Sequence, residues 1–359
     1  MKKIALFYGL FLLFFSTSNA QNPEWLNYTC GKNVMTLAVE DNIIWCGTHG
    51  GLVKIDRNSG NVTFYNKSNS GLPDNFITCI AIDGSGNKWI GTDDGSLVRF
   101  DGTDWTVYNT NNSVLPDDSI ICIAIDDSGN KWIGTHYSGV VKFDGANWTV
   151  YNESNSDLPD NFVTCIDIDS SNNKWIITGV YLVKFDDRSW SLYNLRRSAC
   201  YMTYLAIDGA GNKWIGTSRI FGGVLGGLPA LLKFDGTTFT EYNKSNSGLP
   251  YEDITCIAID SNGDKWIGTK DGSLVNFDGI EWTVYNTSNS DLPHNNITCI
   301  AIDSNGNKWI GTYGSCLVRF NGTDCTAYNT SNSGLPDNNV RSIAIDGGGN
   351  KWIGTEYGG

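Results

Sequence analysis

The chain of 359 residues is poor in charge, and poorest in positive charge. Charged residues make up 18% of it while aromatic residues reach 12%, a balance that excludes an intrinsically disordered chain. Lysine and arginine number 25 against 38 aspartates and glutamates, so the formal net charge is −13. A surface of this sign repels phosphate backbones and anionic lipids, which argues against nucleic acid and membrane surfaces as partners.

Long apolar runs are also absent, except at the N-terminus. Two lysines precede an apolar run from Ile4 to Phe15, and Ser18-Asn19-Ala20 then offers small residues for cleavage. This pattern predicts a signal peptide over residues 1–20 and an exported protein, which is periplasmic, cell-surface or secreted. No cysteine stands directly after the cleavage site to carry a lipid anchor, and the glycine-broken stretch 220–232 is too short to cross a bilayer. The mature chain is therefore expected to have no membrane span.

Residues 21–359 lack a helical period and instead repeat themselves. The motif Lys88-Trp89-Ile90-Gly91-Thr92 has eight versions, whose tryptophans lie 44, 43, 43, 39, 52, 43 and 43 residues apart. The repeats begin near residues 34, 77, 120, 163, 201, 254, 297 and 340. The second repeat holds four strand-like runs separated by turn sequences, at 77–83, 88–92, 97–100 and 105–109. A small sheet of this size buries both its faces by stacking on its neighbours around a ring, which predicts a β-propeller.

The number of blades follows from the strands that each repeat supplies. Seven repeats are complete, whereas the eighth supplies only 340–346 and 351–355. Near the N-terminus, Trp25-Leu26-Asn27-Tyr28 copies the Trp-x-x-Tyr pattern of the outer strand at 105–108. We therefore predict a single all-β propeller of eight four-stranded antiparallel blades, closed by pairing of the N- and C-terminal strands. That closing blade would still lack its third strand, and seven blades plus a half-repeat are the alternative.

The repeat resembles a known family. The string Leu72-Pro73-Asp74, Ile80-Ala81-Ile82-Asp83, Gly86 to Thr92 and Leu97-Val98-Arg99-Phe100 is similar to the two-component regulator propeller repeat, and the resemblance covers nearly the whole mature chain. The resemblance implies that the chain is the sensor half of a hybrid histidine kinase of Bacteroidetes and lies outside the cytoplasm. The signals of such sensors are often oligosaccharides. Because no kinase segment follows, we expect a stand-alone or truncated module with a separate signalling partner. The motif residues of the family are structural, so the resemblance transfers no catalytic or ligand-binding residue.

Most repeated residues are expected to serve the fold. The tryptophans of Trp-Ile-Gly-Thr are predicted to fill the spaces between blades. The Asp-x-x-Gly-Asn segments are predicted to be turns, because they lack the alternating acidic ligands of a calcium loop. No Cys-x-x-Cys pair occurs to suggest zinc, and no metal or cofactor is expected.

Five of the ten cysteines hold the same place in the first strand of their repeats: Cys79, Cys122, Cys165, Cys256 and Cys299. Equivalent points on neighbouring blades should lie on the order of 10 Å apart, too far for a disulfide, so these five are predicted to be buried thiols. The pairing of the remaining five stays open: Cys30, Cys46, Cys200, Cys316 and Cys325.

The loops after the second strand vary most among the repeats. In a four-stranded meander these loops share one face with the blade-to-blade connectors, while the uniform turns share the opposite face. A uniform scaffold with varied loops on one rim is typical of binding sites. The candidate ligand-binding residues on this rim are His49, Asp93, Asp94, His136, Tyr137, Arg219, Lys270, Asp271, Tyr313 and Tyr357. The three histidines, with His294 as the third, fall on this rim in blades that are not adjacent, so a shared metal is not expected.

These patterns favour an exported, non-catalytic binding or sensor propeller that recognises a glycan or protein ligand through its varied loops. No catalytic residue is assigned, because the chain shows neither a nucleophile elbow nor metal-ligand spacing. One alternative is a polysaccharide lyase or glycoside hydrolase that uses rim carboxylates such as Asp94 and Glu356. A structural or adhesive surface protein is the other.

Overall fold

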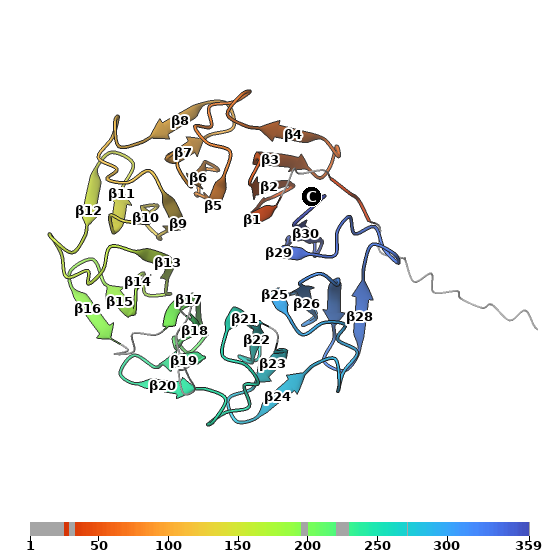
Figure 1. The fold of residues 1–359 in the computed structure, drawn as a ribbon. Coiled ribbons are helices and arrows are strands. Elements are labelled where there is room, and N and C mark those ends of the chain that lie inside the picture. The colour runs from red at the N-terminus through yellow and green to blue at the C-terminus, as the bar shows by residue number, and fades with distance from the viewer. Residues whose placement is uncertain (1–24, 29–32, 195–199, 220–229, 271, 359) are drawn as a thin grey trace, which may run out of the picture.

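The computed structural model describes residues 25–28, 33–194, 200–219, 230–270 and 272–358. All regular structure in these residues is β, and the sheets stand around a common axis like the blades of a propeller (Figure 1). No described helix is long and apolar enough to span a membrane. The predicted signal peptide at 1–20 lies outside the described residues.

Seven sheets are four-stranded meanders, here numbered blades 1 to 7. Blade 1 comprises β1 (Val34–Glu40), β2 (Ile43–Thr48), β3 (Gly51–Asp56) and β4 (Val62–Tyr65), and blade 2 comprises β5 (Ile77–Ile82), β6 (Lys88–Thr92), β7 (Leu97–Phe100) and β8 (Trp105–Tyr108). Blade 3 comprises β9 (Ile120–Ile125), β10 (Lys131–Thr135), β11 (Val140–Phe143) and β12 (Trp148–Tyr151), and blade 4 comprises β13 (Val163–Ile168), β14 (Lys174–Thr178), β15 (Tyr181–Phe185) and β16 (Trp190–Asn194). Blade 5 comprises β17 (Cys200–Ile207), β18 (Lys213–Arg219), β19 (Leu231–Phe234) and β20 (Phe239–Tyr242). Blade 6 comprises β21 (Ile254–Ile259), β22 (Lys265–Thr269), β23 (Leu274–Phe277) and β24 (Trp282–Tyr285), and blade 7 comprises β25 (Ile297–Ile302), β26 (Lys308–Thr312), β27 (Leu317–Phe320) and β28 (Cys325–Tyr328).

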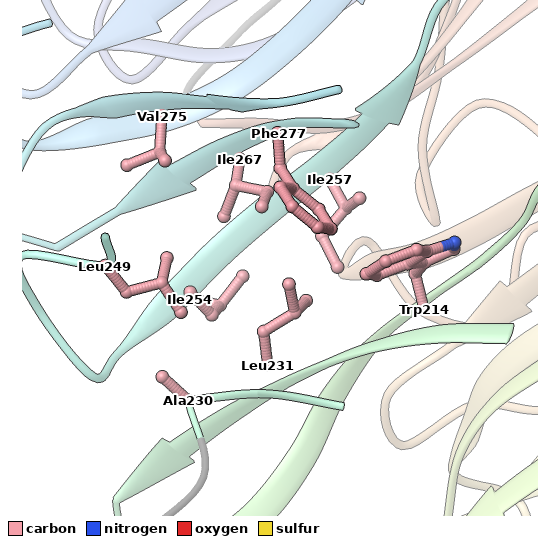
Figure 2. Packing of buried hydrophobic residues seen from close by; sticks show 9 residues of the cluster. All are labelled: Trp214, Ala230, Leu231, Leu249, Ile254, Ile257, Ile267, Val275 and Phe277. Atoms are coloured by element: carbon pink, nitrogen blue, oxygen red, sulfur yellow. The ribbon is translucent and has the colours of Figure 1, made fainter. Parts of the chain in front are cut away.

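The tryptophan of each second strand fills the space between two blades, as predicted. In the cluster between blades 5 and 6, Trp214 meets the edge of Phe277 at 5.9 Å between ring centroids, and Leu231 and Ile254 pack beside them (Figure 2). Burying these side chains removes about 1.5–3 kcal/mol of unfavourable hydration for each. Six of the eight tryptophans are buried in this way, whereas Trp309 and Trp352 are only half-buried.

Polar contacts join each blade to the next near the same tryptophans. The carboxylate of Asp126 accepts a hydrogen bond of 2.9 Å from Trp132 Nε1, and Lys174 of blade 4 lies 3.6 Å from that carboxylate and 4.8 Å from the Trp132 ring centroid. The same aspartate caps its own turn, because its Oδ1 accepts the backbone N–H groups of Ser128 and Asn130. The Asp-x-x-Gly-Asn segments are thus turns, as predicted, and they also carry the interblade ion pair.

The first strands of the blades are linked near the axis. In blade 2 the register shifts between Ile77 and Cys79, which marks a β-bulge at Thr78. Its hydroxyl donates a hydrogen bond of 2.5 Å to the carbonyl of Ile120, the first residue of the neighbouring strand β9. Thr255 and Thr298 make the corresponding bond in blades 6 and 7.

The five cysteines of the first strands carry free thiols, as predicted, but only Cys256 is buried, and the other four are half-buried. Burial raises the pKa of Cys79 to about 11 and that of Cys165 to about 12. Cys46, Cys316 and Cys325 also carry thiols, while Cys30 and the side chain of Cys200 lie outside the described residues.

The eighth repeat forms a two-stranded sheet of β29 (Val340–Ile345) and β30 (Lys351–Thr355), placed between blades 7 and 1 (Figure 1). The all-β propeller of four-stranded antiparallel blades is confirmed, and the complete blades number seven in the described chain, which was the alternative expectation. An eighth complete blade is not formed there because the repeat supplies no described third strand. Residues 25–28 have no strand assignment, so closure by pairing of the terminal strands stays a prediction.

Candidate binding rim

The loops between the second and third strands lie on one face of the propeller, here called the loop face. They comprise 49–50, 93–96, 136–139, 179–180, 270 with 272–273, and 313–316, and 356–358 follows β30 in the same place. The backbone N–H that opens each of these loops bonds to the carbonyl just before the first strand of the same sheet, as in Asp93 to Phe76 at 3.1 Å and Tyr313 to Asn296 at 3.0 Å. The connectors and the varied loops therefore meet on this face, as the meander requires.

A buried threonine closes the base of these loops. Thr135 Oγ1 donates to the carbonyl of Gly139 at 2.9 Å, and Thr217 Oγ1 donates to the carbonyl of Ala230 at 3.3 Å. The first pair spans a short loop and the second spans the long insertion of blade 5, yet the bond is the same. Loop length and sequence can therefore vary without changing how the two strands below are held.

Two of the predicted histidines contact an aromatic ring that leads into the next blade, and His49 stacks on it. His49 lies 4.0 Å from Phe76 between ring centroids, and its Nδ1 is 3.3 Å from Asn33 Nδ2. His136 lies 5.0 Å from Phe162 and 4.1 Å from Tyr137. These rings are partly covered and positioned by their neighbours rather than extended freely into solvent.

Three tyrosines present the most exposed large rings of the loop face. Tyr137 is 71% exposed, Tyr357 is 59% exposed and Tyr313 is 48% exposed. The backbone N–H of Tyr137 donates to Asp117 at 2.8 Å, and that of Tyr357 donates to Asp337 at 2.9 Å. The aspartate of the Leu-Pro-Asp connector thus holds the loop that carries the tyrosine, a role that the sequence reasoning did not assign to it.

A charged pair lies beside the rings at blade 7 and the eighth sheet. Arg341 Nη2 is 2.8 Å from Glu356 Oε2, and its guanidinium carbon lies 5.7 Å from the centroid of Tyr313. The sequence analysis missed Arg341. It occupies the place of Thr78 in the repeat, so a comparison of repeats at that one position could have found it.

The remaining predicted rim residues are spread around the ring. Asp93 is half-buried on blade 2, while Asp94 and Lys270 are exposed on blades 2 and 6. Asp271 and the side chain of Arg219 lie outside the described residues.

His294 belongs to a connector, where its Nδ1 accepts the N–H of Asn296 at 3.0 Å, as the connector aspartates do elsewhere. No group of three or more His, Cys, Asp or Glu side chains in the described part of the chain is arranged to hold a metal ion.

Comparison with known families identifies the repeat. The family model of the two component regulator propeller matches residues 71–94 and 291–314. These two segments are thus similar to the repeat of two-component regulator propellers. Each matched segment runs from a connector through the first and second strands to the start of a loop on the loop face, so it contains the structural core of the repeat.

Solved structures share the fold of these propeller repeats. PorZ, an essential surface component of the type-IX secretion system of Porphyromonas gingivalis, matches with a TM-score of 0.62 and 18% identity over 91% of this chain and 52% of that chain. The chain thus spans about half the length of PorZ. The computationally designed Ika8 protein has a TM-score of 0.64 at 13% identity, covering 92% of this chain and 95% of its own.

Virginiamycin B lyase from Staphylococcus aureus also matches, with a TM-score of 0.57 and 16% identity over 79% of this chain and 94% of that chain. At these identities the likeness concerns the fold alone. No match was found among curated proteins.

Proposed function

We propose that this protein is an exported, non-catalytic sensor propeller that binds an oligosaccharide on its loop face and passes the signal to a separate partner. The observation that carries the proposal is the set of exposed tyrosines on loops that differ between otherwise uniform blades. Two observations agree with the proposal: the matched repeat is described as a regulator propeller, and residues 1–20 have the pattern of a signal peptide.

The chemistry of the rim suits a sugar. A tyrosine ring offers an apolar face to the C–H face of a pyranose and a hydroxyl that stays in the solvent. Arg341 and Glu356 pair with each other at 2.8 Å beside Tyr313, and the remaining N–H groups and carboxylate lone pairs are suited to bond sugar hydroxyls. The negative net charge of −13 favours neutral or basic ligands over acidic ones.

The loops that carry the rings are held in place before any ligand arrives. Asp117 and Asp337 fix the backbone of the loops that carry Tyr137 and Tyr357, and the threonine bonds fix the loop bases. A loop whose backbone is already ordered loses less conformational freedom on binding, which favours affinity.

The test is a screen of the mature chain against a panel of neutral oligosaccharides, followed by calorimetry with the tightest ligand. Tyr137→Ala and Tyr313→Ala should be made separately, and the proposal predicts that at least one weakens binding about tenfold or more. The matched control is Ile280→Ala, because Ile280 is 88% exposed on the opposite face, in the hairpin between β23 and β24. Absence of any binding oligosaccharide, or an Ile280→Ala effect as large as those of the tyrosine variants, would refute the proposal.

A further inference from the structure

The first strands of the eight sheets surround the axis of the propeller (Figure 1). Each is paired along one edge with a second strand and packed on both faces against neighbouring sheets, so its middle residues can meet solvent only at the axis. All residues of β5, β9 and β25 after the first one are half-buried, whereas the second strands β6, β10 and β22 are buried throughout. Solvent therefore enters a space along the axis, which the first strands line and which we call the axial channel.

The middle of this channel has an apolar lining except at one position. In every sheet the residue that pairs with the second-strand tryptophan has isoleucine, leucine or valine on both sides in sequence. In blade 4 that residue is Asp167, which pairs with Trp175. The other seven sheets have alanine there, at Ala38, Ala81, Ala124, Ala206, Ala258, Ala301 and Ala344. The channel thus holds a single carboxylate at a level where the repeat otherwise places a methyl group.

The first strands contain three charged residues, and two of them are already paired. Glu40, at the end of β1, lies 3.2 Å from Lys88 of the next blade. Arg341, near the start of β29, lies 2.8 Å from Glu356. Asp167 forms no ion pair with any basic side chain in the part of the chain that the structure describes. It is therefore the one unmatched charge that the first strands contribute to the channel.

The surroundings of Asp167 disfavour its charge. Its Oδ1 accepts the backbone N–H of Ile168 at 2.9 Å. The nearby Asp169 is the turn aspartate of the blade, and it accepts a hydrogen bond of 2.7 Å from Trp175 Nε1 and lies 3.8 Å from Lys213. Burial raises the pKa of Asp167, and the charge of Asp169 raises it further. Because an uncompensated carboxylate costs free energy that the alanine of the other sheets avoids, the needs of the fold do not account for Asp167.

An aromatic ring projects into the channel near this carboxylate. Tyr204 of blade 5 takes the place that cysteine holds in five blades, and it is 38% exposed. Burial raises its pKa, and the thiols of Cys256, Cys299 and Cys165 raise it further, so the ring reaches into the space that several blades share. Burial and the charge of Asp167 in turn raise the pKa of Cys165, which lies two residues before Asp167, to about 12. The thiol of Cys165 is thus a common neighbour of the carboxylate and the ring.

We propose that the axial channel binds an organic ammonium ion at Asp167, one that carries a single positive charge on an apolar body. The ammonium group pairs with the carboxylate through charge-assisted hydrogen bonds. The ring of Tyr204 adds a cation–π contact, and the isoleucines above and below this level cover the apolar body. A single charge is expected because the first strands offer one unmatched carboxylate. The site lies apart from the tyrosines of the loop face and does not depend on oligosaccharide binding.

The test is calorimetry of the mature chain at pH 7 with three ligands of equal chain length: n-octylammonium, n-octanol and octane-1,8-diammonium. The proposal predicts that octylammonium binds at least about tenfold tighter than octanol, which lacks the charge. It should also bind tighter than the diammonium ion, which would place a second charge in the channel without a partner.

Asp167→Ala is the matched variant, because seven sheets already hold alanine at this position and the fold accommodates it. It should weaken octylammonium binding about tenfold, whereas Asp127→Ala, which removes an exposed carboxylate from a turn of blade 3, should change it less than about twofold. Tyr204→Leu should weaken binding about threefold, and Tyr204→Phe, which keeps the ring, should not. Without ligand, Asp167→Ala should raise Tm, because it removes a charge that has no partner.

Three results would overturn the proposal. Octanol that binds as tightly as octylammonium, or an equal loss of binding in Asp127→Ala and Asp167→Ala, would show that the ligand does not recognise the charge of Asp167. A lower Tm for Asp167→Ala would show that the carboxylate serves stability instead. A loss in Tyr137→Ala as large as that in Asp167→Ala would place the ligand on the loop face. Oligosaccharide binding should be unchanged by Asp167→Ala, so the failure of one proposal is distinguishable from the failure of the other.

Discussion

A double-mutant cycle at Gly334 and Trp25 tests whether the N-terminal segment belongs to the eighth sheet. A Cβ added to Gly334 would lie 2.3 Å from Cβ of Trp25, far inside van der Waals contact. A Cβ added to Gly71 would lie equally close, 2.3 Å, to Cβ of Trp105 in blade 2, where Trp105 is part of the outer strand β8. The tryptophan therefore lies directly on the connector glycine in both places, while Val114 and Asp157 hold the equivalent position in two other connectors.

The magnitudes follow from packing. Gly334→Ala brings a Cβ against Cβ of Trp25, which costs about 1 kcal/mol, the low end for overpacking. Trp25→Gly removes a half-buried ring together with its Cβ and should cost about 2 kcal/mol, less than the 3–5 kcal/mol of a fully buried ring. In the double variant the new Cβ at position 334 meets no Cβ at position 25, so its loss of stability should be smaller than the sum of the single losses by about 1 kcal/mol.

The assay is urea unfolding of the mature chain, the two single variants and the double variant. Gly71→Ala with Trp105→Gly forms the reference cycle within a complete blade, and it should give a coupling energy of the same sign and size. Additive effects at Gly334 and Trp25, alongside clear coupling at Gly71 and Trp105, would refute the placement of residues 25–28 in the eighth sheet.

Three further predictions concern the scaffold. Asp126→Ala removes the acceptor of Trp132 Nε1 and one carboxylate beside the buried Lys174. Urea unfolding should therefore show that the free energy of unfolding falls by about 3 kcal/mol. A decrease below about 1 kcal/mol would contradict the role of Asp126 between the blades. Burial opposes the charge of Asp83, yet hydrogen bonds from Trp89 and Asn87 lower its pKa to about 2. Its contribution to stability should therefore be complete above about pH 4 and should disappear as the pH falls towards 2, which acid titration of Tm would measure. Because Cys256 is buried, and burial raises the pKa of its thiol, this thiol should resist Ellman's reagent near pH 8 until urea unfolds the chain, and rapid reaction in the native protein would contradict its burial.

The repeated parts of the fold could be predicted because each motif residue has one dominant physical role. The 43-residue spacing of the tryptophans sets the blade length, and a ring that must be buried at the same place in every sheet leaves few architectures. The turn role of Asp83 also follows from its own sequence, since an aspartate before Gly-Asn satisfies nearby backbone N–H groups.

The rim was harder to predict because its contacts cross between repeats. The stacking of His49 on Phe76 joins residues of two blades, and no local pattern pairs them. The bond from Tyr137 to Asp117 spans 20 residues, and the sequence alone gives that aspartate only a connector role. Arg341 was overlooked for a different reason. It lies in a first strand, where the repeat predicts residues that pack between blades rather than residues of the rim.

The central claim is that a constant scaffold carries its binding function on the loop face. Hydrogen–deuterium exchange of the mature chain, with and without the tightest oligosaccharide of the panel, tests it most directly. The account predicts slower exchange in 136–139, 313–316 and 356–358, with no change in the hairpins of the opposite face such as 278–281. Protection confined to those hairpins, with the loop face unchanged, would contradict it.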